Sequence, residues 1–294
     1  MPVHAGARLL YSLNMREWFA GRTLTIATMH EKERVIAPLL SAALGVDCRV
    51  PPAFDTDRFG TFTRTVARAG TQVEAARAKA RAALSETGGD LAIASEGSFG
   101  THPAFPLVSR HLELVLLIDT QYGLEVAGWH EEPGTLYRGE YVESVDAALA
   151  LAADWGFPEQ GVVLRAYPER SRGIEKEIRT TDQLRERVTQ RLRRPWCRRV
   201  YLETDLRAHR CPPRRERIAA ATEDLLATLA HPCPHCTAPG FAVAEVLPGA
   251  LCASCGGQTD APRAMVRRCG RCAHEATGAV SAEVDPAQCP RCNP

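Results

Sequence analysis

Eight of the eleven cysteines stand in four C-x-x-C pairs in the C-terminal part of the chain. The pairs are Cys233/Cys236, Cys252/Cys255, Cys269/Cys272 and Cys289/Cys292. Fifteen residues separate the first two pairs and sixteen separate the last two, which is the spacing of zinc ribbons. A two-residue spacer lets one tight turn present two thiolates to a tetrahedral ion. Residues 231–294 are therefore predicted to form tandem zinc ribbons around two zinc ions.

The order of the pairs leaves two assignments of the ligands open. The simplest is sequential, with the first two pairs on one ion and the last two on the other; an interleaved assignment is the alternative. His231, His235 and His274 lie near the pairs and are interpreted as bystanders, because four cysteines are available per site. A full four-cysteine shell leaves no position for water, so both ions are expected to be structural and to supply most of the tail's folding free energy.

The rest of the composition excludes several classes of protein. The 294 residues are 45% hydrophobic and 24% charged, as in an ordinary globular protein. No run of about 18 apolar residues exists and no secretory signal opens the chain, so we expect a cytoplasmic protein without a membrane span.

The charged residues are balanced in number. Lys+Arg is 36 and Asp+Glu is 35, so net charge does not point to a partner. Only Lys32, Lys79 and Lys176 are lysines, so we treat the arginine bias as compositional.

Residues 1–230 alternate between helical and strand patterns. This alternation predicts an α/β fold, with a mixed α+β fold as the alternative, built on a central sheet with flanking helices. We interpret this part as the catalytic domain. Helices are expected at residues 33–44, 72–87, 144–155, 180–192 and 214–229. Strands are expected at residues 24–29, 46–50, 91–95, 161–166 and 200–203, and a hairpin at 112–129.

A strand-to-helix turn carries the first candidate site residues, Thr28, His30 and Lys32. The N–H groups of a helix N-terminus, together with a hydroxyl and a lysine, form a natural phosphate site. The three residues are therefore candidates for phosphate binding. An ordinary turn with exposed polar residues is the alternative.

Two glutamates are candidate ligands for Mg²⁺. Glu96 follows a buried strand and opens a loop rich in glycine and serine, at the strand end where ligands collect in open α/β sheets. It is the leading candidate for a metal ligand or general base. Glu74 stands three residues after Thr71, and a helix capping box explains this spacing by itself.

A further strand end combines Asp205, Arg207 and His209. These side chains offer a metal ligand, a phosphate clamp and an acid/base group. Asp205 and His209 join Glu96 as candidate catalytic residues, and Arg207 is a candidate phosphate contact. The alternative is a charged loop without a catalytic role.

Residues 182–217 contain twelve arginines against five acids. One interpretation is a surface for phosphate or nucleic acid. The other is a solvated face in an arginine-biased protein, because Trp196 and Tyr201 are the only aromatic residues in the stretch.

Two family resemblances rest on these motifs. The first comprises Ile26-Ala-Thr28…Lys32, Gly70-Thr71…Glu74-Ala75…Lys79-Ala80, Thr87-Gly88 and Glu96-Gly97. In this order they resemble the inosine/xanthosine triphosphate pyrophosphatase and Maf-like superfamily, whose members cleave nucleoside triphosphates with Mg²⁺ on an elongated mixed α/β fold. The resemblance implies a phosphate-loop role for Thr28 and Lys32, metal or base roles for Glu74 and Glu96, and a phosphate contact for Lys79. Lys32 stands one residue closer to Thr28 than in the usual pattern, and the paired aspartates of the acidic loop are absent.

The second resemblance spans nearly the whole chain. It is to an uncharacterised bacterial family and implies no activity. The shared segments are Ile26-Ala-Thr-x-His30, Asp55-Thr-Asp57-x-Phe59-Gly-Thr-Phe62, Ser95-Glu-Gly-Ser-Phe-Gly100, Glu203-Thr-Asp-x-Arg-Ala-His209 and the cysteine-pair tail that ends Cys-Asn-Pro294.

Two hypotheses of function follow. In the first, the chain is a Mg²⁺-dependent hydrolase of nucleotides or related phosphate esters with a structural zinc tail. In the second, it is a non-catalytic zinc-ribbon module that binds a protein or nucleic acid. The oligomeric state is left open.

Overall fold

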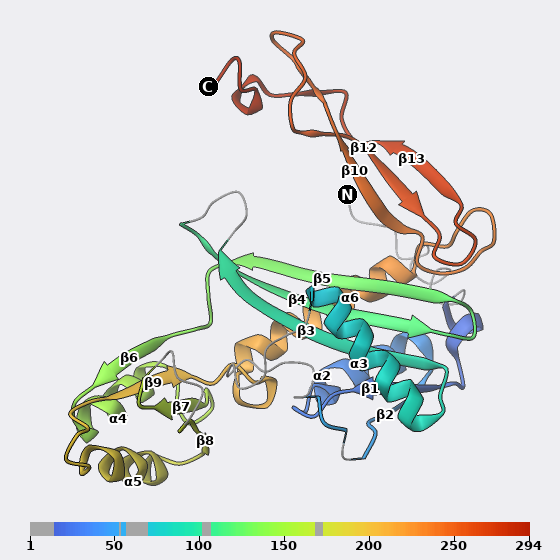
Figure 1. The fold of residues 1–294 in the computed structure, drawn as a ribbon. Coiled ribbons are helices and arrows are strands. Elements are labelled where there is room, and N and C mark those ends of the chain that lie inside the picture. The colour runs from blue at the N-terminus through green and yellow to red at the C-terminus, as the bar shows by residue number, and fades with distance from the viewer. Residues whose placement is uncertain (1–14, 53, 57–69, 102–106, 168–172) are drawn as a thin grey trace.

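The computed structural model describes residues 15–52, 54–56, 70–101, 107–167 and 173–294. Its largest sheet has five strands in the order β2-β1-β3-β4-β5 (Figure 1). The strands are β1 (Thr23–Ala27), β2 (Asp47–Arg49), β3 (Leu91–Thr101), β4 (Ser109–Asp119) and β5 (Leu124–Pro133). β1 runs parallel to β2 and β3, while β3, β4 and β5 are antiparallel to one another. β1 and β3 therefore end toward the same side of the sheet.

Helices cover both faces of this sheet. The alanine-rich α3 (Gln72–Thr87) packs on one face against β1, β3 and β4. On the other face lie α2 (Glu33–Leu44) and α6 (Pro212–Leu229), whose buried leucines and isoleucines join the main hydrophobic core. At Gly128 of β5, an added Cβ would lie 2.2 Å from the backbone nitrogen of Leu225, so only glycine lets α6 approach the strand this closely.

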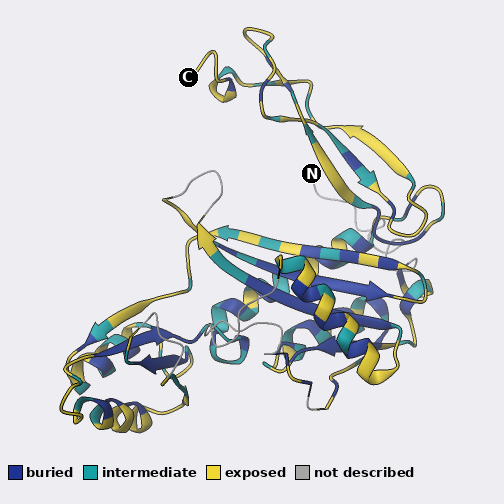
Figure 2. Cartoon of the chain, in the orientation of Figure 1, coloured by how far each residue is buried: buried dark blue, intermediate teal, exposed yellow. Residues whose placement is uncertain are grey.

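A second sheet occupies the middle of the chain. Its order is β6-β9-β7-β8, and all neighbouring strands are antiparallel. The elements are β6 (Gly139–Val142), α4 (Val145–Asp154), β7 (Val162–Arg165), β8 (Glu175–Ile178), α5 (Thr181–Leu192) and β9 (Val200–Thr204). α4 and α5 contribute to a separate core with these strands. The predicted mixed α/β class is confirmed, but its strands form two sheets and not one central sheet (Figure 2).

The structure corrects one expectation that bears on the site. The strand predicted at residues 91–95 continues to Thr101, because residues 91–101 pair with β4 along their whole length. Glu96 therefore lies within a strand and does not open a loop. Alternation in a strand makes Glu96 and Ser95 face opposite sides of the sheet.

The tail consists of short strands that extend away from the main sheet (Figure 1). Its three-stranded sheet has the order β10-β12-β13, and β11 pairs with β14. The bounds are β10 (Ala242–Pro248), β11 (Leu251–Cys252), β12 (Pro262–Arg268), β13 (Glu275–Ala279) and β14 (Glu283–Val284). Short 3-10 turns lie at Ala208–Arg210 and Pro286–Gln288. None of the helices in the described ranges is long and apolar enough to cross a membrane.

Candidate functional site

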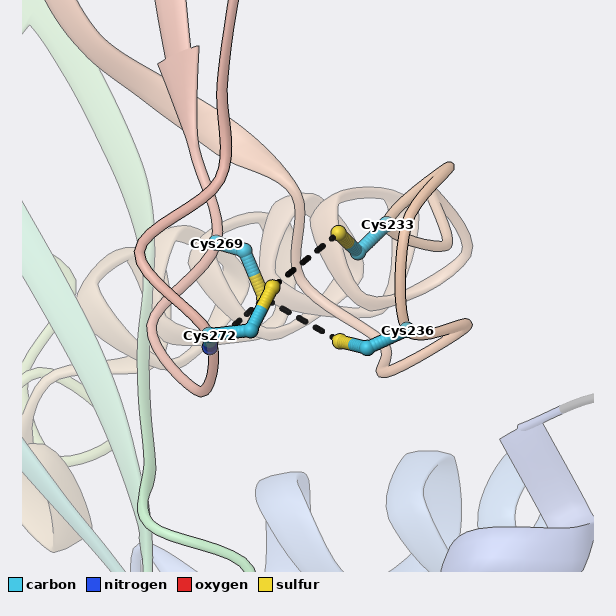
Figure 3. A group of neighbouring side chains, drawn as sticks. All are labelled: Cys233, Cys236, Cys269 and Cys272. Atoms are coloured by element: carbon cyan, nitrogen blue, oxygen red, sulfur yellow. Dashed lines mark hydrogen bonds between the residues drawn. The ribbon is translucent and has the colours of Figure 1, made fainter.

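The eight paired cysteines form two groups of four. The inner cysteine group contains Cys233, Cys236, Cys269 and Cys272, and its sulfurs converge from two loops (Figure 3). The outer cysteine group contains Cys252, Cys255, Cys289 and Cys292. Each group therefore combines cysteines from both predicted ribbons. The inner group takes the first pair of each ribbon, and the outer group takes the second pair of each. The sequential assignment is wrong, and the interleaved alternative is confirmed.

The sulfur geometry of both groups suits a tetrahedral ion. Sγ–Sγ distances are 3.7 and 3.6 Å in the inner group and 3.8 and 3.7 Å in the outer group. Four sulfurs about 2.3 Å from one zinc ion lie about 3.8 Å apart. The groups are thus consistent with two structural metal ions such as zinc.

The strands of the tail explain why the ligands interleave. β10 has seven residues and spans about 24 Å at about 3.4 Å per residue, so it carries the chain from the first cysteine pair to the distant second pair. β12 returns antiparallel to β10 and delivers the third pair beside the first. β13 then runs outward again toward the fourth pair.

The inner cysteine group is built into the main core. Cys233 and Cys269 are 1% and 2% exposed and belong to the same hydrophobic cluster as β1, β4 and α6. An added Cβ at Gly240 would lie 2.5 Å from Val126 of β5, so the loop after the first pair packs directly on the sheet. In the outer group, by contrast, Cys255 and Cys292 are exposed.

Lys32 is the most unusual of the predicted phosphate-binding residues. Its side chain is buried, and its Nζ donates to the carbonyl oxygen of Ser95 at 3.0 Å and to the Ser95 hydroxyl at 2.9 Å. No carboxylate of the described residues forms an ion pair with it. Burial, and then the charges of Arg214 and Lys79, lower the pKa of Lys32 to about 7.

Beside Lys32 lies a buried ion pair between β4 and α6. Arg214 Nε donates to Glu113 Oε1 at 2.7 Å, and both side chains are fully buried. His111 donates to the same oxygen at 2.8 Å, and Arg214 Nη1 donates to the Leu206 carbonyl at 2.7 Å. Burial opposes the ionisation of Glu113, but Arg214, His111 and Lys32 outweigh it and lower its pKa to about 2.

The two candidate magnesium ligands have different surroundings. Glu96 is buried and forms an ion pair with Lys79 of α3. Glu74 accepts a hydrogen bond from the Thr71 backbone at 2.7 Å, while its own N–H donates to the Thr71 hydroxyl at 3.2 Å. The capping box is therefore present at the start of α3, and it occupies the carboxylate of Glu74.

The remaining candidates gather around two histidines. The rings of His30 and His209 stack with centroids 5.2 Å apart. Burial lowers the pKa of His30 to about 3, assisted by the charges of Lys32, His209, Arg207 and Arg214. The backbone N–H of His30 donates to the Thr28 hydroxyl at 3.3 Å.

Arg207 forms ion pairs with two acidic side chains near these histidines. Its Nε and Nη2 donate to the two oxygens of Asp205 at 3.0 and 2.6 Å. Its Nη1 lies 2.7 Å from Glu177 of β8, which also accepts from His209 at 3.3 Å. Asp205 is 1% exposed, so Arg207 supplies the counter-charge of a buried carboxylate and also joins it to Glu177 of β8.

The sequence candidates lie in three groups of contacts. Lys32 lies against Ser95 beside the Glu113–Arg214 pair, Glu96 pairs with Lys79 on the α3 face of the sheet, and His30 stacks on His209 near Arg207 and Asp205. Glu74 belongs instead to the start of α3. Sequence reasoning misses Glu113, Arg214, His111 and Glu177. The pattern His111-Leu-Glu113-Leu is a signal for two of them, because alternate residues of a strand share one face.

Comparison with known proteins bears on this architecture. A family model described as a domain of unknown function (DUF6671) matches residues 79–294, more than half of the chain. The chain belongs to the DUF6671 family. The matched DUF6671 span contains all eight paired cysteines as well as Glu96, Glu113, Asp205 and Arg214, but it begins after Lys32. No curated protein matches the chain at a significant level.

The DUF6671 match confirms the predicted kinship with an uncharacterised family over residues 79–294. It does not test the resemblance of the N-terminal part to the pyrophosphatase superfamily, which stays a prediction. Residues 57–62, which carry part of the family pattern, lie outside the described residues.

Proposed function

We propose that this DUF6671 protein binds a phosphate-bearing small molecule at Lys32 and hydrolyses it. One observation carries the proposal. Lys32 is a buried cation that has no carboxylate partner among the described residues, whereas Lys79, Arg207 and Arg214 each have one. Glu96 and Glu113 attract the Lys32 ammonium from a distance but form no ion pair with it, and an anion bound from solution would supply a direct counter-charge.

The position of Lys32 in the fold supports the same reading. It is the N-cap of α2, five residues after the end of β1, and it lies at the positive end of the helix dipole. β1 is parallel to β3, and ligands of open α/β sheets bind where such strands end. A phosphate group here would meet the Lys32 ammonium close to the start of α2.

The two stacked histidines supply the chemistry that hydrolysis needs. His30 is neutral at pH 7 because its pKa is about 3, so it can accept a proton from water as that water attacks phosphorus. The bond from phosphorus to the leaving oxygen breaks in the same step. A bound phosphate raises the pKa of His30, since an anion offsets the surrounding cations. Protonated Lys32 stabilises the charge on the phosphoryl oxygens.

The Mg²⁺ that the pyrophosphatase resemblance implies does not fit these residues. Glu96 is paired with Lys79, and Glu74 caps α3. Within the described ranges, the only groups of three or more His, Cys, Asp or Glu that could hold a metal are the two cysteine groups. The proposed hydrolysis therefore contains no step at a magnesium ion.

We also infer that the ions of the two cysteine groups are Zn²⁺. The support is the all-thiolate donor set and the sulfur separations, both of which are typical of structural zinc. Because four thiolates fill the shell, these ions stabilise the tail and take no part in the proposed hydrolysis.

Turnover of a substrate panel tests the hydrolase proposal. We expect the zinc-loaded protein to release phosphate or pyrophosphate from at least one nucleoside triphosphate or phosphate monoester. Lys32→Met is expected to lower kcat/KM at least about 100-fold, as the loss of one charge-stabilising donor does in other enzymes. His30→Asn is expected to lower it by about 10²–10⁴-fold. Lys176→Met, on β8, is the matched control. Equal rates for wild type and Lys32→Met would overturn the proposal.

A further inference from the structure

An exposed loop in the second sheet carries arginines that the rest of the fold does not neutralise. We define the arginine loop as residues 193–199, between α5 and β9, with the sequence Arg-Arg-Pro-Trp-Cys-Arg-Arg. All four of its arginines are exposed. No ion pair between these arginines and an acid occurs in the described part of the chain. The loop thus concentrates four positive charges in seven residues.

Neighbouring arginines behave differently, which argues against composition as the explanation. Arg185 and Arg187 on α5 lie within 4.0 and 3.8 Å of Asp146 and Glu175. Arg191, at the end of α5, donates to Glu175 at 2.6 Å. If the arginines were only a compositional bias, we would expect those of the loop to have acidic neighbours like these. The four arginines of the loop have none among the described residues. Glu140 of β6 and Glu143, just after β6, form no ion pair with the loop in the described part of the chain.

The loop also exposes its largest apolar side chain. Trp196 is 80% exposed, the highest exposed fraction among the tryptophans and tyrosines in the described part of the chain. Next to it, the Arg199 guanidinium lies 4.0 Å from the ring centroid of Tyr141, which packs edge-on against Tyr201. An indole ring and an arginine-covered phenol therefore stand beside the four charges.

Backbone hydrogen bonds form successive turns in the loop. The backbone N–H of Arg193 donates to Thr189, that of Arg194 to Arg191 and that of Cys197 to Arg194, at 3.0, 3.1 and 2.9 Å. The turns place Trp196 at the surface, between hydrogen-bonded residues on both sides. Binding through such a loop costs less conformational entropy than binding through a flexible one.

We propose that the arginine loop binds single-stranded nucleic acid, with Trp196 stacking on a base and Arg193, Arg194, Arg198 and Arg199 contacting phosphates. A flat, accessible aromatic ring stacks on any unpaired base, and guanidinium groups match phosphate oxygens with paired hydrogen bonds. A base within a duplex is not available to such a ring, so single strands are favoured. This surface is separate from Lys32 and does not depend on the proposed hydrolysis.

Fluorescence anisotropy with labelled rU12 and dT12 tests this proposal on the full zinc-loaded protein. Four phosphate contacts predict a slope of about −3 in a plot of log Kobs against log salt concentration. Trp196→Ala is expected to weaken binding about 10-fold, and Trp196→Phe to restore most of it. Arg193→Gln with Arg194→Gln is expected to halve the salt slope, whereas the paired Arg185→Gln with Arg187→Gln is expected to change it little. Lys32→Met is expected to bind the oligonucleotides like wild type.

Two results would overturn this proposal. One is oligonucleotide binding that is absent, or that none of the loop variants changes. The other is Trp196-dependent binding to phosphatidylserine vesicles without binding to rU12 or dT12, which would assign the loop to an anionic membrane surface. Because Trp196 and Arg193 are exposed, their variants are expected to fold, and circular dichroism checks this.

Discussion

Replacing Arg214 with methionine is expected to lower the free energy of unfolding by about 3–5 kcal/mol. The guanidinium is 0% exposed and forms the counter-charge of Glu113. Methionine fills a similar volume but leaves the Glu113 carboxylate buried without its cation. It also removes the donor to the Leu206 carbonyl, which ties α6 to the strand end of β9. Urea unfolding at pH 7 measures the change.

Two further variants separate charge from volume in this experiment. In Arg214→Met with Glu113→Gln, the buried charge is gone and the new side-chain amide still accepts a hydrogen bond from His111, so we expect a large part of the lost stability to return. Arg81→Met, on the exposed side of α3, is expected to change stability by less than about 0.5 kcal/mol. A loss at Arg214 no larger than that at Arg81 would show that the ion pair does not hold the strand and helix layers together.

Paired cysteine substitutions are expected to give opposite zinc counts depending on which cysteines are combined. Cys233→Ser with Cys272→Ser removes two ligands of the inner cysteine group, so one zinc ion per chain should remain. Cys233→Ser with Cys255→Ser damages both groups, so the count should fall toward zero. Mass spectrometry of the metal content, with two zinc ions in wild type as the reference, distinguishes the cases. A sequential assignment predicts the reverse result for the two double variants.

The same variants are expected to differ strongly in stability. Cys233 and Cys269 of the inner group belong to the main core. Loss of the inner ion is therefore expected to lower the free energy of unfolding by several kcal/mol. Cys255→Ser with Cys292→Ser removes the outer ion, where two ligands are exposed, and the main sheet should keep its unfolding midpoint. Equal destabilisation by the two losses would contradict the integration of the inner group into the core.

Local signals predict the helices well. The helices predicted at residues 33–44 and 72–87 have those bounds in the structure, because an apolar period and end signals such as Thr71 and Gly88 act within a few residues. Ser144 and Thr180 likewise cap their helices. The strand through Glu96 is predicted too short because glycine and serine suggest a loop, whereas eleven residues of pairing with β4 hold it extended.

Long-range contacts are beyond the sequence. Glu113 and Arg214 are separated by 101 positions, and no local pattern links them. The cysteine spacings suit either assignment, and only the length of β10 decides between them. The roles of the candidate site residues stay predictions, and the structure brings only some of the candidates into contact. His30 stacks on His209, whereas Glu96 pairs with Lys79 on the face of the sheet opposite to Lys32. Glu74 caps α3, a local cause that its spacing already indicates.

The central claim, that Lys32 binds a phosphate group, is tested most directly by titrating inorganic pyrophosphate against pH. With a pKa of about 7, free Lys32 is about half protonated at neutral pH, and a bound anion raises that pKa, so binding takes up a proton. The measurement is calorimetry between pH 6.5 and 9. For wild type and for Lys176→Met, the affinity for pyrophosphate is expected to fall by up to about tenfold per pH unit above pH 7. This fall is counted after correction for the ionisation of pyrophosphate itself. Lys32→Met is expected to bind at least about tenfold more weakly at pH 7 and to lose this additional pH dependence. If Lys32→Met and wild type bind pyrophosphate equally at every pH, Lys32 is not the phosphate site.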